Sequence, residues 1–240
     1  TMIGISWRRE QGPADPLLRR MLEERGLKNV PQWEKEDDVR MAANAYWMGL
    51  VDQRDGPVNP QKREITDPAH ITDEIKQKAL ELGADVVGCC ALTPIMIDDG
   101  FDMPHRNVIS FIVHEDYDNV LQGSRAIERE TYDVYMRVAD ISTELAAFVR
   151  ELGFPAWAHH NGIRQIQAIP TMYHCGFGEL GRHGSLINPT HAANFRPGFV
   201  TTDVPLIPDS PHEFGVQDFC EKCNVCRNNC PGDAIATDHI

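Results

Sequence analysis

The stretch QGSRAIERETYDVYMRVADISTELAAFVRELG, residues 122 to 153, carries the clearest regular pattern in the chain. Apolar side chains recur there at alternating steps of four and three residues, which places them on one face of an α-helix. These residues are Val134, Val138, Ile141, Leu145, Phe148 and Leu152. Gly153 follows as a typical helix stop. We therefore predict a long helix over 122–152 whose apolar face packs on a core.

A second column on this helix begins at Tyr135 and continues with Ala139, Ser142 and Ala146, which are all small. Small side chains allow a bulky group to approach the helix closely. Tight packing against another helix is the alternative, and it is the one that the spacing favours. Both interpretations remain open on spacing alone.

Upstream, the pattern changes between helix and strand. Thr72 is a plausible cap for a helix through Leu82. Two apolar runs, 85–92 and 107–113, are typical of buried strands. Helix, strand, loop and strand in succession indicate an α/β (α+β) domain.

The first 65 residues look helical and polar. Asp15 and Pro16 suit the start of a helix over 17–25, and a second helix should include Trp33, Trp47 and Leu50. The loop 55–60 follows. We expect an N-terminal helical arm at 1–65, a main domain at 66–210 and a third region at 211–240.

Residues 161–205 are rich in glycine, proline and polar side chains, so we expect an irregular segment that lies on the surface or wraps a ligand. GFGELG, residues 176 to 181, matches a dinucleotide-binding fingerprint by letter. No convincing strand precedes it, so a dinucleotide site is not favoured.

The run FCEKCNVCRNNCP, residues 219 to 231, places cysteines at 220, 223, 226 and 230 and a proline directly after them. This is the ligand spacing of bacterial ferredoxins, in which the fourth cysteine binds the other cluster of a pair. A structural zinc is the competing interpretation, but zinc sites usually take ligands from two separated turns. The metal ligands we predict are Cys220, Cys223, Cys226 and Cys230.

A second cluster needs more cysteines than the chain offers. Cys89, Cys90 and Cys175 have no ligand spacing and are expected to be core thiols. We therefore expect the chain to be a fragment that ends within a ferredoxin-like module.

Several segments closely resemble the cobalamin-dependent reductive dehalogenases. They are GFGELGRHGSLINP (176–189), FRPGFVTTDVPLIPD (195–209), FGVQDFCEKCNVCRNNCPGDAI (214–235), LGADVVG (82–88) and AAFVRELGFPA (146–156). The resemblance covers about residues 70–240 and hardly touches the first 65.

The resemblance implies a nitroreductase-like domain that binds base-off cobalamin, followed by the start of a ferredoxin-like module with two [4Fe-4S] clusters in the full-length protein. It implies catalytic roles for Tyr135 as proton donor, Arg196 as its basic partner and Asn161 as a polar contact. Tyr132 is the donor if the register is shifted by one turn. The corrinoid-binding residues implied are Gly176, Gly178, Glu179, Gly181, Arg182, Gly184 and Leu186. No D-x-H-x-x-G motif occurs, so a cobalamin ligated by a histidine of the protein is not expected. The side chains that could contact the cofactor tail or lie at the surface, with the surface favoured, are His159, His160, His174 and His183.

The function implied is reductive cleavage of a carbon–halogen bond of a small organohalide. Electrons would come from an external ferredoxin, flavodoxin or reductase. Alternatives are an epoxyqueuosine reductase-like enzyme acting on tRNA and a non-catalytic iron–sulfur electron carrier. The net charge of −13 argues against a nucleic-acid partner. No apolar run is long enough to span a membrane and no export signal is visible, so a cytoplasmic protein is expected unless an upstream signal is missing.

Overall fold

The structure is a computed structural model and describes residues 16–26 and 36–236. Its helices are α1 (Pro16–Glu24), α2 (Glu36–Gly49), α3 (Pro68–Glu81), α4 (Tyr117–Val120), α5 (Ser124–Glu151), α6 (Ala168–His174), α7 (Val216–Cys223) and α8 (Val225–Asn228). Its strands are β1 (Val86–Ala91), β2 (Asn107–His114), β3 (Ala156–His159), β4 (Glu179–Leu180), β5 (Leu186–Ile187) and β6 (Phe195–Thr202). Two 3₁₀ turns lie at Val51–Gln53 and Pro94–Met96.

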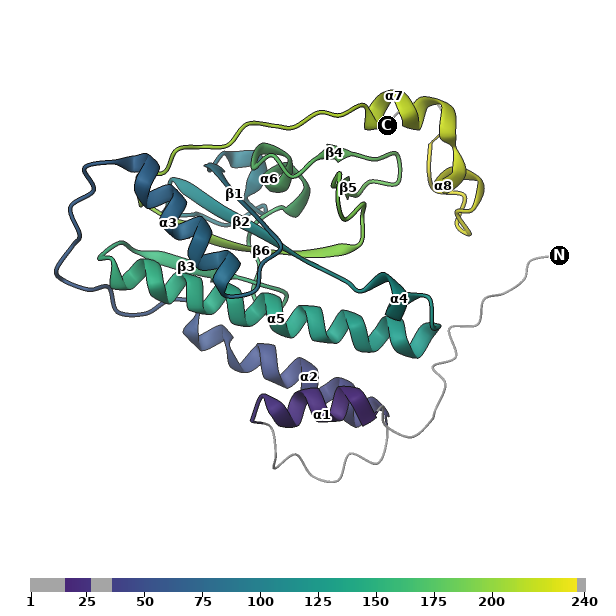
Figure 1. The fold of residues 1–240 in the computed structure, drawn as a ribbon, viewed down its shortest axis with the longest axis horizontal. Coiled ribbons are helices and arrows are strands. Elements are labelled where there is room, and N and C mark those ends of the chain that lie inside the picture. Colours follow the sequence, from purple (N-terminus) through teal and green to yellow (C-terminus); the bar gives the residue numbers. More distant parts are fainter. Residues whose placement is uncertain (1–15, 27–35, 237–240) are drawn as a thin grey trace.

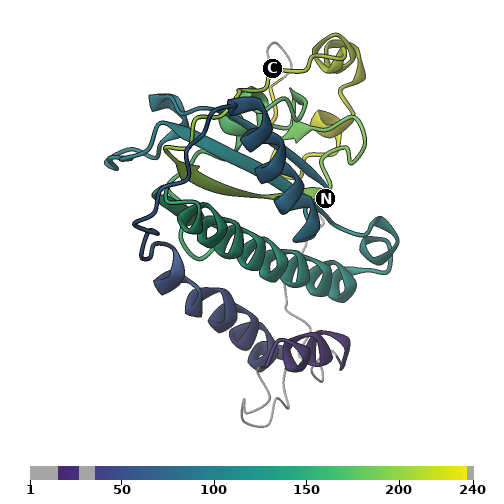
Figure 2. The same cartoon turned by 60° about the vertical axis from the view of Figure 1, so that its left-hand side comes forward.

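A four-stranded antiparallel sheet with strand order β1-β2-β6-β3 forms the centre, and β4 pairs with β5 separately. Helices α3 and α5 cover one face of the sheet and α6 covers the other, while α1 and α2 lie on the outer side of α5 (Figures 1 and 2). The predicted mixture of helix and sheet is thus confirmed.

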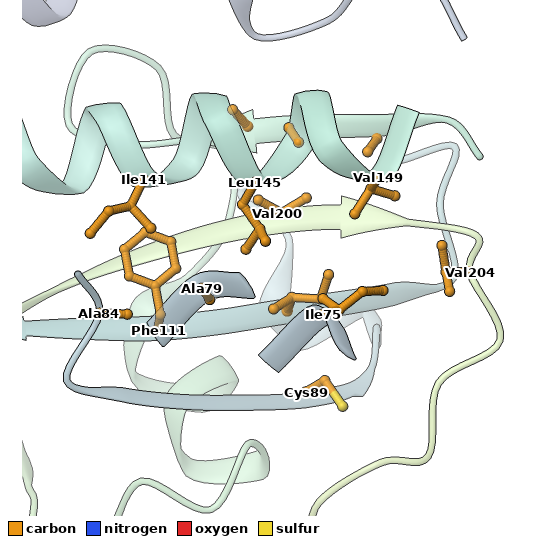
Figure 3. Close-up of a cluster of buried hydrophobic side chains, with 14 of the residues drawn as sticks. Ile75, Ala79, Ala84, Cys89, Phe111, Ile141, Leu145, Val149, Val200 and Val204 are labelled. Atoms are coloured by element: carbon orange, nitrogen blue, oxygen red, sulfur yellow. The ribbon is translucent and has the colours of Figure 1, made fainter. Parts of the chain in front are cut away.

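The long helix is confirmed as α5, and its apolar stripe faces the sheet. Ile141, Leu145 and Val149 of α5 pack against Phe111 of β2 and Val200 of β6 (Figure 3). All five side chains are buried, so this contact removes a large apolar area from water.

The small column on α5 packs against the chain itself. The Ser142 hydroxyl lies 2.8 Å from the Val138 carbonyl and 3.2 Å from the His159 carbonyl. A Cβ on Gly198 of β6 would stand 2.3 Å from the Phe111 ring and 2.8 Å from Ser142 Oγ. Close packing therefore explains the column, with a strand as well as a helix as the partner, because Ala139 contacts the α2 side.

Helix α3 begins earlier than predicted. Asp67, not Thr72, is its N-cap and accepts a hydrogen bond from the Ala69 amide, with Pro68 in the first turn. Thr72 lies inside the helix, where its hydroxyl donates to the Pro68 carbonyl and accepts from the Ile207 amide. The Asp-Pro pair is a stronger start signal than the threonine.

Strand β6 lies in the segment that we predicted to be irregular, and that prediction is wrong for 195–202. Pro197 and Gly198 usually indicate an edge strand or a turn. Here β6 pairs with β2 along its whole length, but β3 joins only from Phe199 onward. Pro197 is therefore paired on one side only, which a strand tolerates.

The helical arm packs on the main body in its described part. Leu22, Ala43 and Trp47 share a buried cluster with Met136 and Ala139 of α5. Asp15 and Trp33 lie outside the described residues. The domain boundaries at 65 and 210 stay predictions. Within residues 16–26 and 36–236, every helix is too short or too polar to traverse a bilayer.

His159 and His160 were expected at the surface, but both are buried. His159 Nε2 and His105 Nδ1 lie 3.0 and 2.9 Å from the same Thr201 hydroxyl. Burial, and then the charge of Arg54, lowers the pKa of His159 to about 3, and burial lowers that of His160 to about 4. Strand pairing explains the error, because His159 ends β3, which pairs with β6, and His160 follows directly in a turn that is bridged to Ile163. His174 and His183 are exposed, as expected.

Replacement of Leu145 by alanine should lower the free energy of unfolding by about 2–5 kcal/mol, because it leaves a cavity in the α5–sheet core. Leu80→Ala on α3 is the matched control, since Leu80 is 43% exposed. Denaturant unfolding measures both. Equal losses in the two variants would contradict this packing.

The buried histidines should make the fold acid-sensitive. A pKa below that of the unfolded chain means that unfolding takes up protons, so stability is present above pH 6.5 and is lost as the pH falls toward the folded-state value. His159→Gln should reduce the difference in unfolding free energy between pH 7.5 and pH 5 by about 2 kcal/mol. His174→Gln is the exposed control and should keep the wild-type difference. An unchanged difference in His159→Gln would show that this imidazole is not buried neutral.

Candidate functional site

The structure brings Tyr135 of α5 and Arg196 of β6 together, as the resemblance implied. The guanidinium carbon of Arg196 lies 5.3 Å from the centre of the Tyr135 ring, a cation–π distance. Both residues are half-buried. The close approach of α5 to β6 at Gly198 places them side by side, since Arg196 and Gly198 point to the same face of the strand.

Glu115, which the sequence analysis missed, holds Arg196 in place. Arg196 Nε donates to Glu115 Oε1 at 2.9 Å, and the Thr131 hydroxyl donates to the same oxygen at 3.2 Å. The Glu115 side chain is only 10% exposed. Its backbone is fixed as well, because the Glu115 amide donates to the Asn194 carbonyl and Asn194 Nδ2 donates to the Glu115 carbonyl.

Trp47 of α2 completes an aromatic wall beside this pair. Its ring meets the Tyr135 ring edge-on, with centroids 5.7 Å apart and planes at 76°. It stacks on Tyr132 at the same centroid distance with planes at 16°. The helical arm therefore contributes directly to the surroundings of the predicted acid, although its sequence carried little resemblance to the family.

Asn161 lies in the turn after β3 and is exposed. The next residue, Gly162, borders α2, because a Cβ there would stand 3.0 Å from the Trp47 carbonyl oxygen. His160 in the same turn is buried, and its Nε2 has no hydrogen-bond partner. The structure thus pairs Tyr135 with Arg196 directly and places Asn161 on a turn that touches the same arm helix.

The glycine-rich segment packs on the opposite face of the sheet. Phe177 and Leu186 belong to the cluster that contains Ile112 of β2 and Phe199 of β6, beneath α6. At Gly178 the φ angle is +145° and a Cβ would stand 2.0 Å from the Ile187 carbonyl, so the chain itself requires glycine there. Gly176 and Gly181 also have chain atoms within 3 Å of a Cβ, whereas Gly184 faces open space. The corrinoid-binding role of this segment stays a prediction.

Glu179 and Arg182 contact residues 214–236, the cysteine-bearing segment. Glu179 is buried and accepts backbone hydrogen bonds at the start of α7. Arg182 donates to the carbonyls of Cys220 and Ala236. These two side chains are thus engaged by the protein's own backbone.

The four cysteines of the run lie along α7, α8 and the turn after them. Cys220 is buried and the other three are half-buried. Backbone amides, first that of Ala234 and then that of Gly232, lower the pKa of the Cys230 thiol. Across the described residues, no three histidine, cysteine or acidic side chains converge closely enough to hold a metal ion. The donor chemistry fits an iron–sulfur cluster, which binds through thiolates, and the ligand roles stay predictions.

The three remaining cysteines are buried, as expected. Cys90 and Cys175 have their sulfurs 3.4 Å apart, and the Cys89 thiol donates to the Ile207 carbonyl. Burial raises the pKa of Cys89 to about 12 and that of Cys175 well above its ordinary value. The thiols of Cys89 and Cys175 are therefore protonated, and all three cysteines are packed in the core, which is typical of a structural role.

A pocket of about 610 Å³ lies beside α6 and the cysteine-bearing segment. Ile169, Tyr173 and Gln217 are among the residues that line it, and Tyr135 and Arg196 are not. The pocket and the tyrosine–arginine pair are therefore separate features of the molecule.

Comparisons with known proteins were made by sequence and by structure. No family model matches the chain. A tetrachloroethene reductive dehalogenase of Desulfitobacterium hafniense is 34% identical over 134 residues, which cover 55% of this chain and 24% of the relative. A tetrachloroethene reductive dehalogenase of Sulfurospirillum multivorans is 29% identical over 221 residues, which cover 75% of this chain and 44% of the relative. The chain thus spans less than half the length of these curated relatives.

Among solved structures, a catabolic reductive dehalogenase in complex with 3-bromo-4-hydroxybenzoic acid has the same fold, with a TM-score of 0.75 and 24% identity. The match covers 95% of this chain and 36% of that one. An epoxyqueuosine reductase of Cyclobacterium marinum matches over only 65 residues, 27% of this chain. Over the part of their length that it spans, the chain is similar to these reductive dehalogenases in sequence and in fold.

Proposed function

We propose that the protein is a reductive dehalogenase that replaces a halogen of a small organohalide with hydrogen. In the overall reaction, R–X takes up two electrons and one proton and yields R–H and X⁻. The relatives named for tetrachloroethene support a haloalkene, and the solved complex with a brominated hydroxybenzoate supports a haloaromatic. The observation that carries the proposal is the Tyr135–Arg196 pair, a proton source beside a fixed cation.

Cobalamin and [4Fe-4S] clusters are the cofactors that we infer. A bound cobalamin would supply a metal centre able to deliver electrons to a carbon–halogen bond, and the clusters would supply those electrons. Side chains that stay partly exposed beside Tyr135 are compatible with a bound cofactor there. Tyr135 is half-buried there, the Arg196 side chain keeps 37% exposure, and Trp47 forms an apolar wall. Cys220, Cys223, Cys226 and Cys230 would hold cluster iron.

Tyr135 is the residue that we assign to proton donation. An ordinary phenol has a pKa of about 10 and is a weak acid at neutral pH. A nearby cation stabilises the phenolate that remains after the proton has left, which makes donation easier. Arg196 is the cation in reach, because its guanidinium carbon lies 5.3 Å from the centre of the Tyr135 ring.

Glu115 and Trp47 act through this pair. The Glu115 carboxylate fixes Nε of Arg196 and leaves the other two guanidinium nitrogens outside that ion pair. The Trp47 ring meets the Tyr135 ring edge-on and so covers one side of it. Both effects position the proton donor and its partner without direct chemistry of their own.

The proposal is tested on protein reconstituted anaerobically with cobalamin, iron and sulfide, with a reduced viologen as electron donor. We expect halide release and formation of the product with one halogen fewer from tetrachloroethene or from 3-bromo-4-hydroxybenzoate. If the protein binds both cofactors and releases no halide from either compound, the proposal is wrong. Conversion of an epoxyqueuosine-containing tRNA stem loop would favour the alternative enzyme.

Tyr135→Phe should lower the turnover rate by about 100-fold or more, because it removes the proton that general acid catalysis needs. Tyr132→Phe is the matched control, since it removes a hydroxyl from the other tyrosine that contacts Trp47. Cobalt and iron content should be unchanged in both variants. A large loss in Tyr132→Phe with full activity in Tyr135→Phe would move the acid to Tyr132.

A further inference from the structure

The buried carboxylate of Glu179 lies at the start of the cysteine-bearing segment. Its Oε1 accepts hydrogen bonds from the backbone amides of Gly215 at 2.7 Å and Val216 at 3.2 Å, and also from that of Phe214. Amides in the first turn of a helix lack partners within the helix, so this carboxylate supplies what α7 needs at its N-terminus. Glu179 itself is only 4% exposed.

Arg182 contacts both ends of the cysteine run. Its Nε donates to the Cys220 carbonyl at 3.1 Å and its Nη1 donates to the Ala236 carbonyl at 3.0 Å. Cys220 is the first cysteine of the run, and Ala236 follows the last one. One guanidinium therefore closes the loop that carries all four thiols.

A third pair of residues joins the same two segments. Gln217 Nε2 donates to the Leu180 carbonyl at 2.5 Å. The four residues Glu179–Arg182 thus bind the cysteine-bearing segment at its start, within α7 and beyond its last cysteine. Closing a flexible loop costs conformational entropy, and contacts at both ends meet that cost before any cluster binds.

These contacts are at odds with a corrinoid-binding role for the two charged side chains. Glu179 is buried, and its Oε1 is engaged by three amides. Two nitrogens of Arg182 are engaged by carbonyls. We propose that Glu179 and Arg182 are positioning residues for the iron–sulfur segment rather than corrinoid ligands, an inference that rests on the proposed function for the cluster itself.

The charge of Arg182 adds a second effect. The guanidinium is hydrogen-bonded to the backbone of Cys220, a predicted cluster ligand, and reduction would add an electron to a bound cluster. A neighbouring positive charge favours the reduced state, because the reduction potential depends on net charge and hydrogen bonds around the cluster. Loss of this charge should therefore make the potential more negative.

The test compares Arg182→Gln, Arg182→Lys and Glu179→Gln with wild type and with Arg164→Gln, a control at an exposed arginine. Iron, acid-labile sulfide and cobalt are measured per chain after anaerobic reconstitution. We expect iron and sulfide to fall at least two-fold in Arg182→Gln and Glu179→Gln, with cobalt unchanged. In a redox titration, the clusters that remain should have a more negative potential in Arg182→Gln than in Arg182→Lys, which keeps the charge.

A wild-type iron content with a lower cobalt content would overturn the proposal and assign the two residues to corrinoid binding. Unchanged iron and cobalt, or an equal fall of both metals with wild-type circular dichroism, would overturn it too. Wild-type protein that binds no iron would contradict the proposed function. The positioning role of Glu179 and Arg182 is then tested separately, by limited trypsin digestion. Cleavage at Lys222 and Arg227 should be faster in Arg182→Gln than in Arg164→Gln, and equal rates would overturn the positioning role.

Discussion

The close contact between α5 and β6 is the constraint on which the rest of the structure depends. Gly198 leaves no space for a side chain between Phe111 and Ser142, so helix and strand meet at minimal distance. Core packing at native density makes such a contact intolerant of an added methyl group. The same contact sets the alignment that brings Tyr135 and Arg196 together. A packing requirement in the middle of the sheet thereby sets the relative position of the two residues that are proposed to carry the chemistry.

Two sets of polar contacts connect the sheet to the residues of the proposed site. On the α5 face, Glu115 fixes Arg196 and so orients a cation over the Tyr135 ring. On the other side, the hairpin of β4 and β5 carries the residues that bind the cysteine-bearing segment. Asp209 supports the connection between β6 and that segment, because its carboxylate accepts from the Cys89 amide and from Lys76. Tyr135, the proposed acid, and the cysteine-bearing segment, the proposed cluster site, are therefore both connected to the same sheet.

Strong local patterns were enough to predict much of the fold. The helical period over 122–152 gave α5, and the apolar runs gave β1 and β2, because each pattern depends on residues close in sequence. Strand β6 was missed because Pro197 and Gly198 are turn signals locally, while their tolerance depends on where β3 begins to pair. Tertiary pairing overrode local propensity there.

The candidate site was predictable only in part. The resemblance to the dehalogenases pointed to Tyr135, Arg196 and Asn161, and the structure pairs the first two. Glu115 had no sequence signal, since its partner Arg196 is 81 positions away. The glycine-rich motif was associated with the cofactor, yet Gly176 and Gly178 are required by backbone atoms of the chain itself in close approach. A sequence motif shared with a family does not by itself distinguish residues that contact a ligand from residues that the packing of the chain requires.

The strand order has a consequence for how the chain folds during synthesis. β6 lies between β2 and β3 in the sheet, although it is the last of the four in sequence. While the ribosome makes residues 115–194, β2 has β1 on one side and an unpaired edge on the other. An open apolar edge favours pairing with other chains, and contacts between distant segments form slowly. A nascent chain of this protein is therefore most prone to aggregation just before β6 emerges, when nearly all of its core side chains are present and none can yet close the sheet.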